Sequence, residues 1–95
     1  MILSFKDKET ERIFNRIKSR KLPDDIQRRA ARKLTAIHEA AALQQLAIIP
    51  SNHLEPLSGK RTGEWSIRIN DQWRITFIPI DGGSNYIDVG IEDYH

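Results

Sequence analysis

The sequence predicts an α+β domain, with an N-terminal strand and two antiparallel helices followed by a three-strand antiparallel meander. Two patterns support this fold class. Apolar residues recur at helical spacing through the first half of the chain, and from Glu64 onward they alternate with polar residues at the period of a strand. A length of 95 residues suits one domain covering residues 1–95. Helices that precede a meander are expected to pack on one face of its sheet.

The first half of the chain carries the first strand and both helices. Residues 2–5 are mainly apolar and indicate a strand. Asp7 is a suitable N-cap, and a first helix is expected over residues 8–18. A second helix is expected over residues 24–42, because a proline and two acidic residues mark its start. Its apolar stripe advances in steps of three and four residues: Ile26, Ala30, Leu34, Ile37 and Ala41.

The second half carries a long loop and three strands. Residues 47–63 lack a clear period and contain two prolines and two glycines, which indicates a loop. Loops longer than about 12–15 residues are often functional. The alternating segments 65–69 and 73–77 are joined by a tight turn, and Pro79 either ends the second segment or places it at a sheet edge. A glycine-rich turn then leads to the last strand, residues 86–91.

Composition excludes several classes of protein. Hydrophobic residues make up 39% and charged residues 29% of the chain, which is typical of a globular protein and not of a disordered one. The absence of cysteine excludes disulfides and thiolate metal sites, and it fits a reducing compartment such as the cytoplasm. No apolar run approaches the length of a membrane span, and the first residues lack the layout of a signal peptide. We therefore expect a cytoplasmic protein with no membrane partner.

Positive charge is concentrated in the first half of the chain. The net charge is +2 and the pI is near 9.2. Residues 1–47 hold eleven Lys and Arg against six Asp and Glu, whereas residues 48–95 hold four against seven. This distribution indicates a surface that faces a polyanion or an acidic partner. A solvated helix face would produce the same pattern.

Strand alternation identifies the first candidate site residues. Arg68 and Arg74 are expected on the face of the sheet opposite the core, where two arginines can clamp a phosphate. Ordinary exposed strand residues are the alternative. Asp93 and His95 share parity on the last strand, so they are expected on one face, near Arg74 if that strand pairs beside residues 73–77. A frayed terminal residue is the alternative for His95.

An acid, a phenol and an imidazole in three consecutive positions suit the cleavage of RNA. A base takes the proton of the ribose 2′-hydroxyl, whose oxygen attacks the adjacent phosphorus; a cation stabilises the phosphoryl oxygens, and an acid protonates the departing 5′-oxygen. Asp93 is the candidate base, His95 the acid and Arg74 the cation. Tyr94 is a candidate for stacking on a base or assisting proton transfer. This chemistry needs no metal or other cofactor, and the three histidines show no metal-ligand spacing.

Four motifs in order resemble the HigB or "killer protein" branch of the RelE toxin superfamily. They are Leu54-x-Pro56-Leu57-x-Gly59, Glu64-Trp65-Ser66-Ile67-Arg68, Trp73-Arg74-Ile75-Thr76-Phe77 and Glu92-Asp93-Tyr94-His95. The resemblance covers essentially the whole chain. It implies a RelE-like fold and a toxin of a type II toxin–antitoxin system, which cleaves mRNA in the ribosomal A site without a cofactor and so inhibits translation and growth.

The resemblance also implies partners and site residues. The partners are a HigA-type helix-turn-helix antitoxin, the ribosome at its 30S A site with its rRNA and mRNA, and operator DNA, which the toxin–antitoxin complex binds to repress its own operon. The family's strand arginine matches Arg74, and its terminal acid and imidazole match Asp93 and His95, with Tyr94 between them.

Two positions depart from the family pattern. Better-studied members carry a histidine where this chain has Glu55, and a lysine where it has Ser58. Both family residues are implicated in cleavage, so we expect a weak toxin or an altered codon preference. His53 has the same strand parity as Glu55 and is a candidate substitute. Lys60 and Arg61 are candidates for supplying the missing positive charge.

Basic residues outside the catalytic set are candidate contacts to RNA, because cations attract the phosphate backbone. An acidic stretch of the antitoxin is an equally good partner for those on the helices. The candidate RNA-binding residues are His53, Lys60, Arg61, Arg68, Arg28, Arg29, Arg32 and Lys33.

Two other function classes compete with a ribosome-dependent nuclease. The first is a catalytically poor relative that blocks the ribosome or serves as an operon corepressor, which the departures at Glu55 and Ser58 favour. The second is a small basic α+β domain with no RNA role, which the ordered motifs disfavour. Removal of Tyr94 and His95 separates the nuclease from the catalytically poor relative, because cleavage should vanish while antitoxin and ribosome binding persist.

Overall fold

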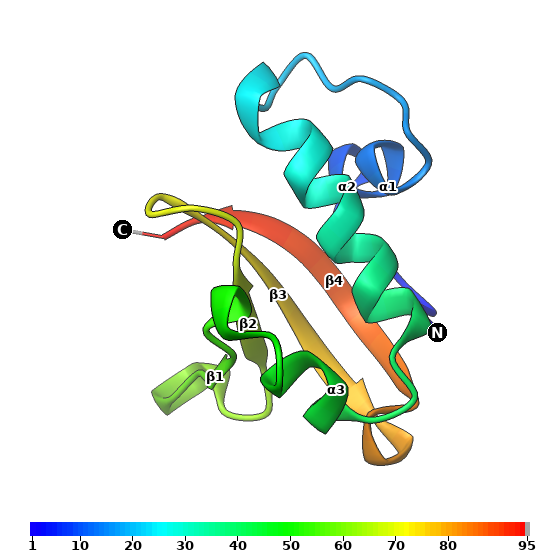
Figure 1. Ribbon diagram of the computed structural model, residues 1–95, viewed down its shortest axis with the longest axis vertical. Coiled ribbons are helices and arrows are strands. Elements are labelled where there is room, and N and C mark those ends of the chain that lie inside the picture. The colour runs from blue at the N-terminus through cyan, green and yellow to red at the C-terminus, as the bar shows by residue number, and fades with distance from the viewer. Residues whose placement is uncertain (95) are drawn as a thin grey trace.

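A computed structural model describes residues 1–94 and shows three helices and one sheet. The helices are α1 (Lys8–Phe14), α2 (Asp24–Glu39) and α3 (Leu43–Ala47). The strands are β1 (Glu55–Pro56), β2 (Trp65–Arg68), β3 (Trp73–Ile80) and β4 (Asn85–Asp93). They pair antiparallel in the order β1-β2-β3-β4. Figure 1 shows α2 crossing one face of this sheet with α1 beyond it. The predicted α+β class is confirmed.

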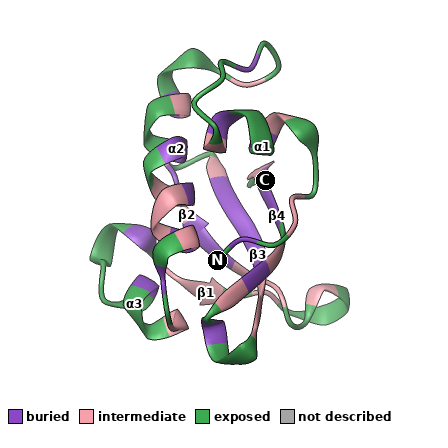
Figure 2. Ribbon diagram, turned by 90° about the vertical axis from the view of Figure 1, so that its right-hand side faces the viewer, coloured by how far each residue is buried: buried purple, intermediate pink, exposed green. Residues whose placement is uncertain are grey.

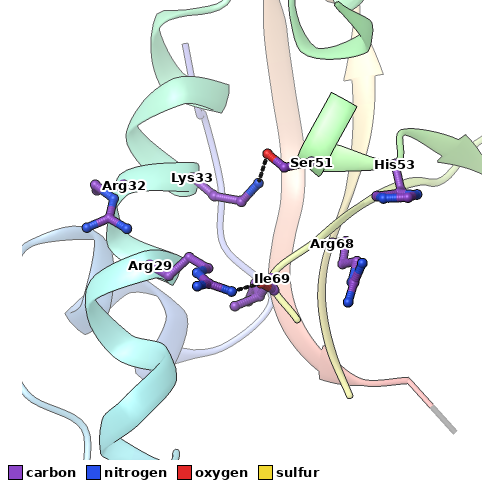
Figure 3. A pocket seen from close by; sticks show the side chains of 7 residues that line it. All are labelled: Arg29, Arg32, Lys33, Ser51, His53, Arg68 and Ile69. Carbon is purple, nitrogen blue, oxygen red and sulfur yellow. Dashed lines mark hydrogen bonds between the residues drawn. The ribbon is translucent and has the colours of Figure 1, made fainter. Parts of the chain in front are cut away.

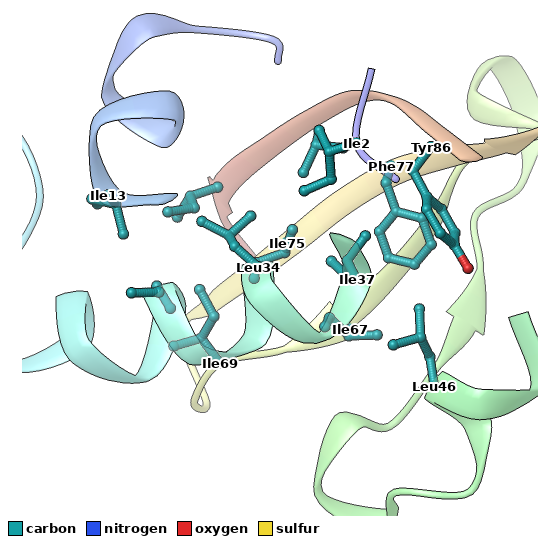
Figure 4. Close-up of a cluster of buried hydrophobic side chains, with 14 of the residues drawn as sticks. Ile2, Ile13, Leu34, Ile37, Leu46, Ile67, Ile69, Ile75, Phe77 and Tyr86 are labelled. Atoms are coloured by element: carbon teal, nitrogen blue, oxygen red, sulfur yellow. The ribbon is translucent and has the colours of Figure 1, made fainter. Parts of the chain in front are cut away.

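The hydrophobic core lies between α2 and the sheet. Leu34 and Ile37 of α2 are fully buried and face Ile67, Ile75 and Phe77 of the sheet (Figure 4). Burial of such side chains contributes about 1.5–3 kcal/mol each, so these contacts fix α2 on the sheet. Buried residues follow β3, β4 and the inner side of α2, whereas α3 and the turns are mostly exposed (Figure 2). The predicted inward faces of the strands and of the helix stripe from Ile26 to Ile37 are therefore confirmed, whereas the last stripe residue, Ala41, lies beyond the helix and is exposed.

Both main helices end earlier than predicted. The first stops at Phe14 instead of residue 18, because Arg16 adopts a left-handed backbone conformation with φ of 63°. Ile17 then lies outside the helix and is 47% exposed. The second stops at Glu39 instead of residue 42, because Ala40 is extended. The apolar spacing predicted both helices to be longer than they are, because the spacing continues into the segments that follow them.

The N-terminal strand is reduced to two bridges. Ile2 and Phe5 pair in parallel with Tyr86 and Val89 of β4. The amide of Leu3 donates to the Tyr86 carbonyl at 2.8 Å. The two bridges fall on either side of Asp88, where β4 has a left-handed backbone, so the pairing is not continuous. Helix α1 begins soon afterwards, at Lys8. The segment still closes the free edge of β4.

The sheet has one strand more than the predicted meander. The additional strand is β1, whose two residues lie within the expected loop 47–63 and pair with β2. It was not predicted because two residues are too few to show an alternation of apolar and polar side chains. The chain also continues as β3 through Pro79 to Ile80. Strand β2 pairs with β3 only as far as Phe77. Pro79 lies beyond that point, where β3 has no β2 residue beside it, so the amide hydrogen that proline lacks is not needed for a bond to β2.

The turn between β2 and β3 forms where the sequence predicts it. The side-chain oxygen of Asn70 accepts the backbone amides of Gln72 at 2.9 Å and Trp73 at 2.8 Å. This local bonding is typical of asparagine in turns. Among residues 1–94, no helix is long and apolar enough to cross a membrane.

Candidate active site

Arg74 is the centre of the candidate site. It projects from β3 on the face opposite the core, as predicted, and is only 8% exposed. Its Nη1 donates to Ser66 Oγ at 2.9 Å and to the His53 carbonyl at 3.3 Å. Its Nη2 forms an ion pair with Glu55 Oε1 at 2.8 Å. The ring of Tyr94 lies over the guanidinium, with Cζ 4.6 Å from the ring centroid. These four neighbours hold the guanidinium in place.

Strand register explains why these side chains meet. Glu55 is paired with Ser66 across β1 and β2, so both project on the same face. Arg74 is paired with Arg68 on one side and with Glu92 on the other. Tyr94 follows Glu92 by two residues, which returns it to the face of Arg74.

Asp93 does not share that face. Strand β4 pairs beside β3 as expected, but the register places Asp93 opposite Trp73. The carboxylate of Asp93 and the guanidinium of Arg74 therefore leave the sheet on opposite faces, in contrast to the sequence expectation. The Asp93 carboxylate accepts a hydrogen bond from Gln72 Nε2 at 3.1 Å. His95, the candidate acid, lies outside the described residues.

A charge cluster of Lys6, Arg61, Glu64 and Glu92 lies beside this site and was missed by the sequence reasoning. Lys6 Nζ is 2.9 Å from carboxylate oxygens of both Glu64 and Glu92. Arg61 Nη2 is 2.9 Å from Glu64 and 2.6 Å from Glu92. Thr76 Oγ1 donates a further hydrogen bond to Glu92. The cluster fastens the loop after β1 to the end of β4, two residues before Tyr94.

The cluster fixes the ionisation of its carboxylates. Hydrogen bonds from Arg61 are the main reason that the pKa values of Glu64 and Glu92 fall to about 2, although burial opposes the shift. Both are therefore ionised at neutral pH, and Glu92 is not a proton donor. Burial lowers the pKa of Lys6, but hydrogen bonds to the same carboxylates outweigh it, and the pKa is raised. Arg61 is occupied by carboxylates rather than turned toward a substrate.

A second feature is the basic pocket, a cavity of about 580 Å³ lined by Arg29, Arg32, Lys33, Ser51, His53, Arg68 and Ile69. Figure 3 shows the cations of α2 on one wall and His53 with Arg68 on the other. Five of the eight predicted RNA-binding residues meet here. His53 reaches this pocket because its backbone is left-handed, with φ of 44°. The strand parity that suggested His53 as a substitute for Glu55 therefore does not apply.

The remaining predicted residues lie elsewhere. Arg28 lines a separate groove between α1 and α2. Lys60 and Ser58 are exposed on the loop after β1. Within residues 1–94, no group of three or more His, Cys, Asp and Glu side chains is placed to hold a metal ion.

The fold is that of a known group of toxins. The structure resembles the YoeB-YefM complex from Staphylococcus aureus with a TM-score of 0.57, at 17% identity, over 100% of this chain and 98% of that chain. The sequence model that matches residues 3–95 describes a RelE-like toxin of type II toxin-antitoxin system HigB. The chain belongs to this HigB-like family of toxins.

Two curated relatives agree with this assignment. Toxin HigB-1 of Vibrio cholerae is 40% identical over 83 residues, which cover 86% of this chain and 87% of that protein. Endoribonuclease HigB of Proteus vulgaris is 38% identical over 95 residues, which cover the full length of both. The resemblance inferred from four short motifs is confirmed.

Proposed function

We propose that this toxin is a ribosome-dependent mRNA endonuclease, which cuts the message in the A site and so inhibits translation and growth. The observation that carries the proposal is the position of Arg74, a buried cation held by four neighbours beneath Tyr94 at the end of the sheet. A fixed guanidinium is suited to stabilising charge on a phosphoryl group. The relative from Proteus vulgaris is named an endoribonuclease, which supports the same chemistry.

The reaction uses the 2′-hydroxyl of the message as the nucleophile and requires no metal. Asp93 takes the hydroxyl proton, the O2′–P bond forms, and the P–O5′ bond breaks. His95 donates a proton to the departing O5′, while Arg74 stabilises the equatorial oxygens. Tyr94 stacks on a base or assists the proton transfer. The products are a 2′,3′-cyclic phosphate and a 5′-hydroxyl end.

The ribosome is required because the side chains alone do not form a complete phosphate site. Arg74 is paired with Glu55, so a phosphate has to compete with a carboxylate for the guanidinium. The side chain of Asp93 projects from the face of the sheet opposite that of Arg74. A ribosome that holds and bends the message can bring the 2′-hydroxyl and the phosphate to groups that lie on two faces. Cleavage is therefore weak, and it takes place only on the ribosome.

The proposed partner in the resting cell is a HigA-type helix-turn-helix antitoxin. The family is defined by type II toxin–antitoxin systems, and the similar structure from Staphylococcus aureus is that of a complex. We propose that the toxin–antitoxin complex also binds operator DNA and represses its own operon. The ion pair between Glu55 and Arg74 favours one alternative, a catalytically poor toxin that blocks the ribosome or acts as a corepressor.

Expression of the chain without antitoxin tests the proposal. Growth is followed and new mRNA 5′ ends are mapped, beside the double variant Asp93→Ala/His95→Ala. The nuclease predicts growth arrest with cuts at codon-phased positions, both lost in the double variant. Arrest without cuts, or arrest that survives in the double variant, would favour ribosome blocking.

A further inference from the structure

The basic pocket combines crowded positive charge with a lining that, among residues 1–94, contains no carboxylate. Its lining includes the four cations Arg29, Arg32, Lys33 and Arg68. Burial, followed by the charges of the three arginines, lowers the pKa of Lys33. Arg68 has an acidic partner, Asp71, which is almost fully exposed. Repulsion among cations is costly unless a negative charge relieves it. The pocket is therefore suited to an anion.

We infer that this pocket binds a phosphodiester of the single-stranded message adjacent to the one held at Arg74. The inference rests on the proposed function and adds to it the place on the toxin where the neighbouring part of the message binds. The pocket and the Arg74 site share a wall. Arg68 is directly paired with Arg74 across β2 and β3, and the His53 carbonyl accepts a hydrogen bond from Arg74. The side chains of both Arg68 and His53 line the pocket (Figure 3). One strand of RNA can contact both the pocket and the Arg74 site.

Two cations of the pocket, Lys33 and Arg29, are held in position before a ligand arrives. Lys33 Nζ donates to Asn52 Oδ1 at 2.6 Å and to Ser51 Oγ at 3.4 Å. Asn52 is 2% exposed and donates in turn to the Leu46 carbonyl at 3.0 Å. Arg29 Nη1 donates to the Ile69 carbonyl at 3.1 Å. Groups fixed in this way lose little conformational entropy on binding, which favours affinity.

The chemistry of the lining favours RNA over an acidic peptide. A docked peptide normally buries apolar side chains in a groove. Within the described part of the chain, Ile69 is the only aliphatic residue that lines the pocket, and because it is 3% exposed it provides no apolar floor. The groove between α1 and α2 differs, because Ile13, Ile17 and Ala31 line it. Guanidinium groups match phosphate oxygens, and the imidazole of His53 offers a surface for an unstacked base.

Binding of an uncleavable RNA to the full-length toxin, free of antitoxin, tests the inference. The probe is a fluorescent single-stranded oligonucleotide with 2′-O-methyl groups throughout, and anisotropy is measured over a range of salt concentrations. The pocket variant is Arg29→Gln/Arg32→Gln. The charge-matched control is Arg20→Gln/Lys21→Gln, whose residues are exposed on the loop before α2 and do not line the pocket. Arg32→Gln alone serves if loss of the Arg29 hydrogen bond impairs folding.

The pocket variant is expected to bind RNA more weakly, with the slope of log affinity against log salt reduced by about 0.7 for each lost phosphate contact. The control is expected to keep the native slope. The two proposals can be refuted separately. If the native protein binds RNA more tightly than the pocket variant but does not cut the message on ribosomes, the pocket is supported and the nuclease is refuted.

Any of four results would overturn the inference. Native affinity and slope in the pocket variant would remove the pocket from the binding site, and equal weakening of binding by the control would indicate diffuse charge attraction. A poly-glutamate peptide that displaces the RNA and itself requires Arg32 would identify an acidic peptide as the ligand. Native binding of the oligonucleotide together with lost sedimentation on ribosomes would assign the pocket to ribosomal RNA instead of the message.

Discussion

The guanidinium of Arg74 and the carboxylate of Glu55 form an ion pair, with Nη2 2.8 Å from Oε1. An unpaired carboxylate at position 55, where better-studied family members carry a histidine, would repel a phosphate, because both groups are negatively charged. In the structure Glu55 instead supplies negative charge to a cation that is 8% exposed. A buried charge without a partner is costly. The carboxylate thus partners this charge and, under the proposed mechanism, stands where a phosphate would bind.

Neutralising Glu55 separates these two effects. Glu55→Gln keeps the size of the side chain but removes the charge that offsets Arg74. We expect the free energy of unfolding to fall by about 1–3 kcal/mol, while cleavage on ribosomes becomes faster because the phosphate loses its competitor. Thermal unfolding and the cleavage rate are measured on the same preparation. Unchanged stability together with unchanged cleavage would show that the ion pair matters for neither.

Restoring the family residues tests the departure directly. The double variant Glu55→His/Ser58→Lys returns positive charge to the loop and frees Arg74, so we predict stronger growth arrest than with the native chain. Toxicity is measured by induced expression at matched protein levels. Glu55→Ala is the control for loss of the carboxylate alone. Growth arrest no stronger than native would count against a catalytic role of these two positions.

Acid sensitivity should depend on Arg61. The pKa values of Glu64 and Glu92 are lowered from 4.5 to about 2 in the folded protein. The unfolded chain therefore binds more protons between these values, so the stabilisation is present above about pH 4.5 and is lost as the pH falls toward 2. Arg61→Gln removes the main cause of both shifts. We expect it to flatten this part of the stability curve and to cost about 1 kcal/mol at neutral pH.

Lys60→Gln is the matched control for this measurement, because it changes the neighbouring exposed cation, for which no ion pair is found within residues 1–94. Its stability should follow pH as the native protein does. An Arg61→Gln curve that still falls steeply between pH 4.5 and 2 would place the origin of the acid sensitivity elsewhere.

Tyr86 offers a test of the core. Its side chain is fully buried against Phe77, with ring centroids 5.4 Å apart, and no hydrogen-bond partner for its hydroxyl is found within residues 1–94. A buried hydroxyl without a partner costs about 1–3 kcal/mol. Tyr86→Phe is therefore expected to leave stability unchanged or to raise it. A clear loss of stability in denaturant unfolding would show that the hydroxyl has a partner.

Local patterns predicted the parts of the fold that repeat along the chain. The stripe through Leu34 and Ile37 and the outward position of Arg74 follow from helical and strand periods, and both are found. The two residues of β1 could not be predicted, because a pattern needs more than one repeat. The charge cluster was missed for a different reason. It joins Lys6, Arg61 and Glu92 across most of the chain, and no local signal connects them.

The face of Asp93 illustrates a further limit. Parity along β4 shows which of its residues share a face, but only the register with β3 shows which of them face Arg74. That register shifts at a bulge between Thr76 and Ile78, where Asp88 of β4 has a left-handed backbone with φ of 51°. A bulge adds one residue to one strand and exchanges the faces beyond it. The bulge thus contributes to placing Glu92 rather than Asp93 opposite Arg74, and the alternation of the sequence does not reveal it.

The most direct test of the central claim is cleavage by purified toxin of a defined message, with and without programmed ribosomes, beside Arg74→Lys. Lysine keeps the charge but cannot reproduce the planar fork that contacts Ser66, His53 and Glu55. The account predicts cuts within the A-site codon only on ribosomes, with 2′,3′-cyclic phosphate ends, reduced about 10²–10³-fold in the variant. Equal cleavage of free message, or native cleavage by Arg74→Lys, would contradict it.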